Sequence, residues 1–377
     1  MTVRLQQLDA LRGIAILLVL GRHVGDLPKH LPSWLLAPLE IWKHVGWMGV
    51  DLFFVTSGFL VSTLVFREHS RTGSFSARKF LIRRGFKIYP LYYLLIGAGF
   101  IWLRPLLHTY PPGTMLAEAL LVQNYYPGQG YFPLGHTWSL AVEEHFYIGL
   151  AVLLPFCLRK QSLLNRLPQL CVGLMVFVFT LKCLGAAGLL GQFDGNQFSQ
   201  FTHLRIDALT FGILLAYANQ YRHETAKQFF LANKNKLIAA SLLMPLPCAL
   251  GGYSSPLLFS FGLTLEYLGF GILLMLMIYC LDSSKQKPNL LSAIGVCSYS
   301  IYLWHDPIGR LVLQKSLPAE LFIVQVAVYC LLCIVIGLVS FKLIETPMIS
   351  LRNRLFPDNA IGRISGLPEI KKDPVAV

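Results

Sequence analysis

Long apolar segments are the feature that most restricts how this chain can fold. Residues 256–281 and 319–344 are two such segments, and about 20 apolar residues are enough for a helix to cross the hydrocarbon core of a bilayer. Of the 377 residues, 55% are apolar and only 14% are charged, and the mean hydropathy is +0.57. A soluble domain of this size does not need so much apolar surface. We therefore predict an all-α, polytopic membrane protein.

The apolar pattern predicts about ten membrane-spanning helices. They cover roughly residues 7–25, 45–67, 88–104, 137–158, 168–191, 204–219, 237–253, 256–281, 290–312 and 319–345. The longest external connection is 105–136, in which "TMLAEALLVQN" is compatible with a short interfacial helix. No small-x-small cleavage site follows the first apolar run, so we expect a retained helix and not a signal peptide. We assign residues 1–346 to a transmembrane domain and 347–377 to a short, basic cytoplasmic tail.

The distribution of lysine and arginine orients these helices. If the N-terminus is cytoplasmic, every cytoplasmic loop is richer in these residues than the external loop before it, as the positive-inside rule requires. We therefore expect both termini in the cytoplasm and contact with membrane lipids on all sides. The net charge is +13. The basic residues lie between apolar segments and not on one soluble face, so this charge does not indicate nucleic-acid binding.

The eight cysteines do not form a recognisable metal or redox motif. Only Cys330 and Cys333 have C-x-x-C spacing, and they lie inside a lipid-length helix without a second pair of ligands nearby. We treat all eight as packing residues and expect no metal.

Ionisable side chains at membrane depth indicate where a site lies. Each costs about 3 kcal/mol on insertion scales and therefore usually faces the protein interior. Arg12 and His23 lie on one stripe of the first helix, because eleven residues are close to three turns, about 16 Å. In the predicted topology Asp51, Glu143 and His305 reach the same external layer as His23 from three other helices.

Two helices carry polar stripes through apolar surroundings. Glu143 repeats with Ser139 and Tyr147 at i−4 and i+4, which makes it a better candidate for the interior than its neighbour in the chain. Tyr302 and His305 share a face of the ninth predicted helix. We take both as candidate substrate contacts, with packing or an interfacial structural role as the alternative.

A basic segment, "SARKFLIRRGFKIYP", precedes the third predicted helix and contains Arg83, Arg84 and Lys87. Two interpretations fit it. The segment can anchor the helix at the cytoplasmic surface and contact anionic lipids, or its planar guanidinium groups can bind phosphate.

Six stretches together resemble the acyltransferase-3 family of integral-membrane O-acyltransferases, and they occur in the family's order from the first helix to the ninth. They are "LDALRGIAILLVLGRH" (8–23), "GVDLFFVTSGFL" (49–60), "RRGFKIYPLYYL" (83–94), "HTWSLAVEEHFYIGL" (136–150), "LRIDALTFGILLA" (204–216) and "SYSIYLWHDP" (298–307). The resemblance implies a multi-pass enzyme of the bacterial inner membrane. Such an enzyme moves an acyl group, usually acetyl from cytoplasmic acetyl-CoA, to a hydroxyl of a cell-envelope glycan such as lipopolysaccharide O-antigen or exopolysaccharide.

The resemblance also implies roles for individual residues. His23 corresponds to the family's catalytic histidine, and Arg12 with the arginines before the third helix, here Arg83 and Arg84, to its donor-binding residues. One departure is visible: the family's R-x-x-R motif is Arg84-x-x-Lys87 in this chain. Lys87 keeps the charge but loses the bidentate fork of a guanidinium.

These residues suggest a mechanism with His23 as the base that takes the proton of the acceptor hydroxyl. Either Glu143 or Asp51 could fix the tautomer of His23, and the sequence does not choose between them. The competing interpretation for His23 is a buried histidine bonded to a backbone carbonyl. For the two carboxylates it is an interhelical hydrogen bond or ion pair.

Two other functions use similar residues. A proton-coupled transporter would also place histidines and acids in the membrane, but it predicts inverted repeats that we do not find. A flippase or polymerase subunit would act on lipid-linked glycans without acyl chemistry. Dependence on CoA would separate the enzyme from both. The acceptor glycan, the length of the acyl group and the oligomeric state are open at this stage.

Overall fold

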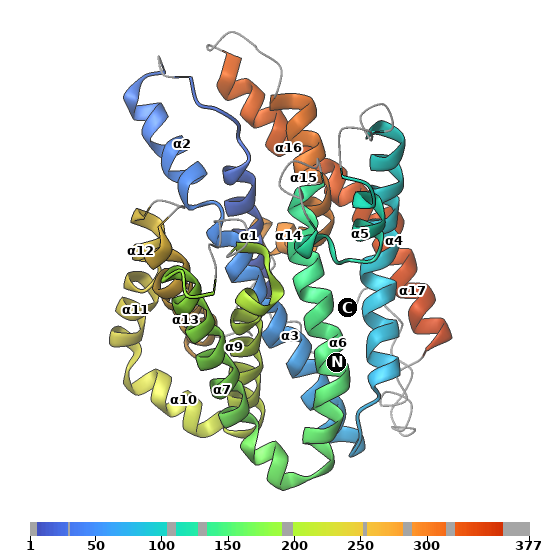
Figure 1. The fold of residues 1–377 in the computed structure, drawn as a ribbon, viewed down its shortest axis with the longest axis vertical. Helices are drawn as coiled ribbons and strands as arrows, with labels where there is room; N and C mark the ends of the chain where they lie inside the picture. The colour runs from blue at the N-terminus through green and yellow to red at the C-terminus, as the bar shows by residue number, and fades with distance from the viewer. Residues whose placement is uncertain are drawn as a thin grey trace.

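The computed structural model of the protein describes residues 6–28, 31–103, 111–126, 134–190, 199–251, 255–281, 289–313 and 321–356 (Figure 1). Helices account for most of these ranges, and the ranges contain no β-strand. The prediction of an all-α protein is therefore confirmed for the described part of the chain.

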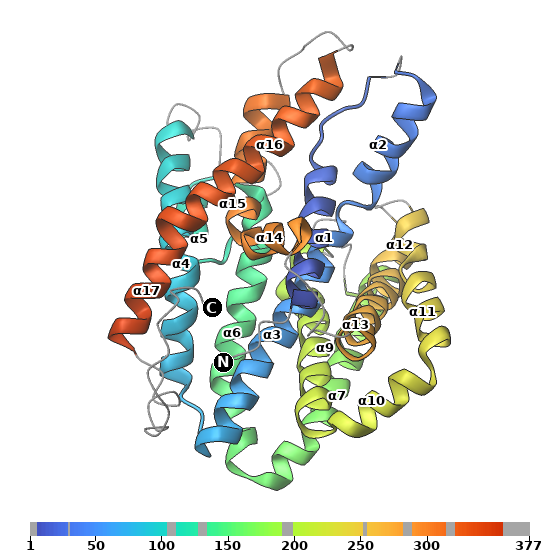
Figure 2. The same ribbon diagram turned by 180° about the vertical axis from the view of Figure 1, so that it is seen from behind.

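The longer helices run side by side through the molecule, as both views show (Figures 1 and 2). They are α1 (Gln6–Arg22), α3 (Met48–Thr72), α4 (Ala77–Leu103), α6 (Trp138–Arg159), α7 (Gln161–Ala186), α9 (Thr202–Tyr221), α13 (Leu263–Cys280), α15 (Ser298–Leu313) and α16 (Phe322–Ser340). The shorter α-helices are α2 (Ser33–Val45), α5 (Thr114–Ala119), α10 (His223–Ala232), α11 (Lys234–Leu243), α12 (Leu246–Leu250), α14 (Leu290–Val296) and α17 (Thr346–Leu355). Two 3₁₀ turns, η2 (Gln123–Tyr125) and η4 (Gly135–Thr137), and two π-helical turns, η5 (Leu258–Gly262) and η8 (Phe341–Glu345), complete the described elements.

Within the described ranges, five helices are long and apolar enough to cross a membrane. They are Met48–Thr72, Gly135–Arg159, Gln161–Ala186, Leu258–Cys280 and Phe322–Leu355. The other predicted spans coincide with α1, α4, α9, the α11–α12 pair and the α14–α15 pair. A membrane protein is therefore supported, whereas the ten crossings and the cytoplasmic location of both termini stay predictions.

The structure differs from the sequence prediction at several helix boundaries. The predicted span 237–253 is two short helices that break before Pro245, and the span 290–312 breaks at Cys297. Proline removes an N–H donor and clashes with the preceding turn, which explains the first break. Helix α4 begins at Ala77, so the basic segment is helical. Helix α2 was not predicted, and α5 with η2 replaces the single short helix expected in the external connection.

Glycine allows a close contact between helices α3 and α9. A Cβ atom at Gly58 of α3 would lie 2.2 Å from the carbonyl oxygen of Leu209, and one at Gly212 of α9 would lie 2.5 Å from the nitrogen of Phe59. Backbones approach this closely only where small residues line the interface. The α3–α9 pair therefore has no room for larger side chains at these two positions.

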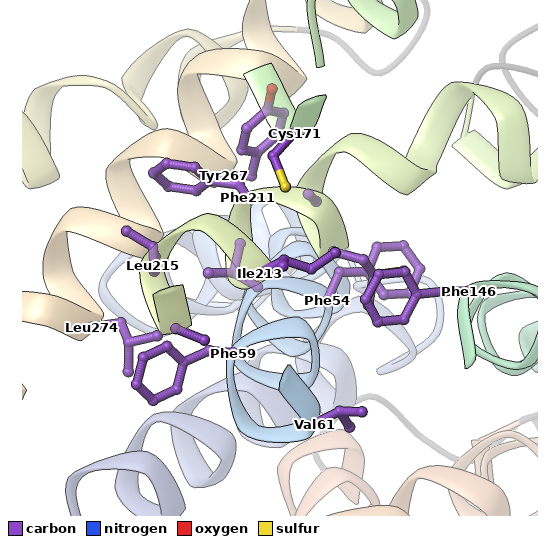
Figure 3. Packing of buried hydrophobic residues seen from close by; sticks show 14 of the residues in the cluster. Phe54, Phe59, Val61, Phe146, Cys171, Phe211, Ile213, Leu215, Tyr267 and Leu274 are labelled. Atoms are coloured by element: carbon purple, nitrogen blue, oxygen red, sulfur yellow. The ribbon is translucent and has the colours of Figure 1, made fainter. Parts of the chain in front are cut away.

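The interior and the outer surface are both apolar, as expected for a protein surrounded by lipid. Aromatic and aliphatic side chains from α3, α6, α7, α9 and α13 form one cluster (Figure 3). Large side chains on the outside of α7 and α16, such as Phe177 and Leu331, are more than half exposed. These helices present a lipid-compatible face.

The connections α3–α4, α6–α7 and α9–α10 lie at one end of the molecule, the lower end in Figure 1. These connections belong to the arginine- and lysine-rich segments of the chain. Their common location is what the positive-inside pattern requires of a cytoplasmic face.

Candidate active site

Three histidine rings from separate parts of the chain meet beside the C-terminal end of α1. His23 directly follows α1, His305 lies on α15 and His136 lies on η4. The ring centroids of His23 and His305 are 4.5 Å apart, and those of His305 and His136 are 4.9 Å apart, both in edge-to-face arrangement. The fold therefore joins two residues that the sequence singled out, His23 and His305, and adds a third.

Backbone carbonyls fix the tautomers of His23 and His305. The Nδ1 atom of His23 lies 3.0 Å from the carbonyl oxygen of Val19, and Nδ1 of His305 bonds the carbonyl of Tyr302. A carbonyl can only accept, so Nδ1 carries the proton and Nε2 keeps its lone pair in a neutral ring. Among the described residues, the buried Nε2 of His305 has no hydrogen-bond partner. Both rings thus have the electronic form that a general base needs.

His136 connects the histidines to a carboxylate that the sequence did not single out. Its Nε2 lies 3.2 Å from the carbonyl oxygen of Leu303, and its Nδ1 lies 3.6 Å from Oδ2 of Asp306, an ion-pair distance. The same Oδ2 accepts a hydrogen bond of 3.0 Å from Nε of Arg310. Asp306 also interacts electrostatically with His23. It is therefore the carboxylate that serves this histidine cluster.

Tyr302 forms one fixed wall of the site. Its hydroxyl lies 2.7 Å from the carbonyl oxygen of His136, to which it donates, and 2.6 Å from Oγ of Ser139. The polar stripes predicted on the fourth and ninth spans therefore meet each other.

A cavity of about 140 Å³ borders His23 and His136. Its polar lining consists of histidine, arginine, tryptophan, tyrosine and serine side chains, without a carboxylate. The lining residues are Val19, Arg22, His23, Gly46, Trp47, Val50, His136, Trp138, Ser199, Arg205, Phe259, Leu263 and Tyr302. We call this space the histidine chamber.

Two smaller cavities, each of about 60 Å³, continue from the histidine chamber along the inside of the bundle. The first, the middle chamber, shares the side chains of Val50 and Tyr302 with the histidine chamber. The second, the basic chamber, shares Arg12, Phe53, Glu143 and Tyr299 with the middle chamber. Adjacent chambers thus have common walls, and the series follows α1 from His23 to Arg12.

The basic chamber contains two of the three predicted donor-binding residues of α4. Arg84 and Lys87 line it, and the guanidinium of Arg84 lies 5.8 Å from the ring centre of Tyr147. The Nε atom of Arg84 is buried and, within the described ranges, has no hydrogen-bond acceptor. Lys87 interacts electrostatically with Arg12 and with the buried carboxylate of Glu345. This concentration of positive charge fits a phosphate-bearing ligand.

Arg83 and the predicted tail take different places. Arg83 is half-buried on α4 but does not line the basic chamber. The first part of the tail is helix α17, and Phe356, the residue directly after it, makes a ring contact with Phe86 of α4. Arg352 of α17 also interacts electrostatically with Lys87. Residues 346–355 thus pack on the transmembrane helices, whereas residues 357–377 lie outside the described ranges.

Glu143 faces the interior, as the helical stripe predicts. It lines both smaller chambers beside Arg12 and accepts a hydrogen bond of 3.2 Å from the hydroxyl of Tyr147. Glu144 is also buried, and its Oε2 accepts a hydrogen bond of 2.9 Å from Tyr89 of α4. Glu143 is thus placed near the middle of the chamber series, one chamber away from His23.

Asp51 does not orient His23 in this structure. Its Oδ2 lies 2.6 Å from a terminal nitrogen of Arg205, and both side chains are buried. A second buried ion pair, with the same separation, joins Lys182 to Asp207. This geometry matches the ion-pair alternative for Asp51, and the tautomer of His23 is set by Val19 and not by either predicted carboxylate.

A polar cluster around Glu118, which lies on α5 in the connection between α4 and α6, supports His136. The hydroxyl of Thr137, next to His136 in η4, lies 2.7 Å from Oε2 of Glu118, which also accepts from Tyr92. Burial of the Glu118 carboxyl raises its pKa to about 8. Glu118 is therefore mostly neutral at pH 7.

Sequence reasoning missed His136 and Asp306, although both lie in stretches that carry the family resemblance. One signal was available: in the predicted topology each is an ionisable residue at the same level as His23 and His305. Their contact could not be inferred, because it joins the turn before α6 to the middle of α15. No group of residues in the described ranges has a metal-binding arrangement.

Comparison with known proteins identifies the family of the chain. The model of the acyltransferase-3 family, described as an acyltransferase domain, matches residues 5–342. The chain is similar to O-acetyltransferase OatA of Staphylococcus aureus strain NCTC 8325, with 27% identity over 368 residues. It is also similar to a putative O-acetyltransferase of strain COL, with 25% identity over 374 residues.

Each comparison covers 90% of this chain but only 56% of the relative, so the chain spans a little over half the length of these proteins. No solved structure matches. Because the family match extends over nearly the whole chain, this protein belongs to the acyltransferase-3 family of acyltransferase domains.

Proposed function

We propose that this protein is a membrane O-acetyltransferase that moves the acetyl group of cytoplasmic acetyl-CoA to a hydroxyl of a cell-envelope glycan. The observation that carries the proposal is the series of three chambers with common walls, which leads from Arg84 and Lys87 past Arg12 to His23. Family membership and the names of the two relatives support the same reaction class.

The basic chamber is suited to the phosphates of the donor. Arg84 and Lys87 supply charge at the end of the bundle that the arginine-rich connections mark as cytoplasmic, and Arg12 lies one chamber further in. The lining of the middle chamber is mostly apolar and aromatic, so we assign this chamber to the extended, uncharged arm of the donor. The charged nucleotide thus stays at the cytoplasmic face while the thioester reaches His23. Arg83, outside the chamber lining, is a candidate for the surface-exposed part of the nucleotide.

Acetyl transfer in the histidine chamber needs one base, and no proton is gained or lost over the whole reaction. The Nε2 atom of His23 takes the proton of the acceptor hydroxyl while the hydroxyl oxygen forms a bond to the acetyl carbon. The bond from that carbon to sulfur breaks, and His23 returns the proton to the leaving thiolate. Asp306, acting through His136, favours the transient positive charge on the histidine cluster. His305 and Tyr302 border the position of the acceptor.

The first test replaces His23 with alanine in membranes that hold the natural acceptor. We expect acetyl transfer from labelled acetyl-CoA to the glycan to disappear while CoA binding is retained. His203→Ala is the matched control, because His203 is exposed at the start of α9 and outside the chamber lining. Full acetyl transfer by His23→Ala would refute the assignment of the base.

A second measurement tests the donor site. We expect Arg84→Ala to weaken CoA binding about tenfold or more, since a hydrogen bond to a charged group contributes about 1.5–3 kcal/mol. Arg78→Ala on the exposed side of the same helix should bind CoA normally. Equal affinity in both variants would remove Arg84 from the donor site. If the purified protein neither binds CoA nor depends on it, a transporter or flippase becomes the better explanation.

A further inference from the structure

The wall between the histidine chamber and the middle chamber is built from few side chains. Val50 of α3 and Tyr302 of α15 are the two residues that line both spaces. Phe53, one helical turn after Val50, lines the middle and basic chambers and contacts Tyr302 edge to face, with ring centroids 6.1 Å apart. We call Val50, Phe53 and Tyr302 the partition. A thioester that travels from the basic chamber to His23 has to pass it.

The two sides of the partition differ in how firmly they are held. Tyr302 is fixed by hydrogen bonds of its hydroxyl to the carbonyl of His136 and to Ser139, at 2.7 and 2.6 Å. Val50 and Phe53 have only apolar side chains, so rotation of these side chains opens the passage at a smaller cost than movement of Tyr302. The width of the passage is therefore determined mainly by the volume of the side chains on α3.

We propose that Val50 and Phe53, against the fixed ring of Tyr302, select acyl donors by cross-section and limit transfer to unbranched acyl groups. This inference rests on the proposed function, since it assumes that the thioester reaches His23 through the chambers.

The selection acts on branching more than on length. An unbranched acyl chain is no wider than the unbranched end of the thioester arm that directly follows it, so a passage wide enough for this end of the arm admits the chain. A branch at the carbon next to the carbonyl adds a methyl group at the widest point and has to displace the partition. Close-packed interiors respond to single methyl groups, and one such group in an apolar pocket changes specificity by about 10- to 200-fold.

The test compares n-butyryl-CoA with isobutyryl-CoA, two donors of equal composition that differ only in branching. Labelled acyl transfer to the glycan is measured in membranes of the source organism that lack the natural gene and carry wild type or a variant. In wild type we expect n-butyryl or acetyl transfer to exceed isobutyryl transfer by about tenfold or more. A wild-type ratio of isobutyryl to acetyl transfer near one overturns the proposal, whatever the variants do.

Two variants should widen the passage. Val50→Ala and Phe53→Leu are each expected to raise the ratio of isobutyryl to acetyl transfer about tenfold. Val55→Ala is the matched control: Val55 lies on the same helix and is completely buried, but it lines none of the three chambers, so its ratio should stay at the wild-type value. An unchanged ratio in Val50→Ala and Phe53→Leu overturns the proposal, as does an equal rise in Val55→Ala.

The same experiment separates this inference from the proposed function. If wild type transfers acetyl groups but the variants do not change the ratio, only the partition is refuted. If wild type transfers no acyl group from any CoA donor to the glycan, the proposed function itself fails.

Discussion

Replacing Asp51 with asparagine tests whether this residue belongs to the reaction or to the packing of the bundle. Asp51 and Arg205 are 1% and 3% exposed, and their charged atoms are 2.6 Å apart. Asparagine keeps the size of the side chain but leaves the buried guanidinium without its counter-charge. Breaking one side of a buried ion pair costs about 3–5 kcal/mol. We therefore expect Asp51→Asn to lower the thermal stability strongly.

A double-mutant cycle isolates the ion pair from other effects. Arg205→Met alone leaves the Asp51 carboxylate uncompensated and should also destabilise the protein. The double variant Asp51→Asn with Arg205→Met contains no buried charge at this position, so it should recover much of the loss. The measurement is the thermal unfolding midpoint of purified protein in detergent micelles, together with acetyl transfer for each variant.

A surface pair provides the control. Asp26 is fully exposed and pairs with Lys43 at 3.2 Å, and solvent-exposed pairs contribute little. Asp26→Asn should therefore leave the unfolding midpoint unchanged. If Asp51→Asn also unfolds at the wild-type temperature but loses acetyl transfer, Asp51 acts in the reaction and the ion-pair reasoning is refuted.

Two further predictions concern the residues around His136. Asp306→Asn should lower the turnover about 10- to 100-fold with unchanged CoA affinity, because the amide has no charge to favour a protonated histidine. Equal losses of turnover and of CoA affinity would contradict this role of Asp306. The raised pKa of Glu118, about 8 against an ordinary 4.5, means that folding favours the protonated acid. The free energy of unfolding should therefore fall as pH rises from about 5 to 8, by up to about 5 kcal/mol. The measurement is the unfolding midpoint from pH 5 to 9, and Glu118→Gln should remove the contribution of Glu118 to its pH dependence. The same pH dependence in wild type and Glu118→Gln would refute the raised pKa of Glu118.

The sequence predicted the elements that depend on local chemistry. Apolar runs and turn residues located the main helices, because a helix in lipid has to satisfy its backbone hydrogen bonds within itself. Spacing along single helices also predicted that Arg12 and His23 share a stripe and that Glu143 faces inward. All three residues line the chamber series. Helix α2 was missed because it lies in a connection without a span-length apolar run, and none of its residues is buried.

Contacts between distant segments were decided only by the tertiary structure. His23 is equally compatible from sequence with Asp51 or Glu143 as a partner, since both occur at the right level of the membrane. The fold pairs Asp51 with Arg205 across the tight glycine contact of α3 and α9, and it brings His136 and Asp306 to the histidine cluster. Helical periodicity specifies the face of a side chain, but the neighbour of that face depends on how the helices pack. The sequence alone therefore determined the class of protein and the face of α1 that carries Arg12 and His23, and packing between helices determined which carboxylate serves His23.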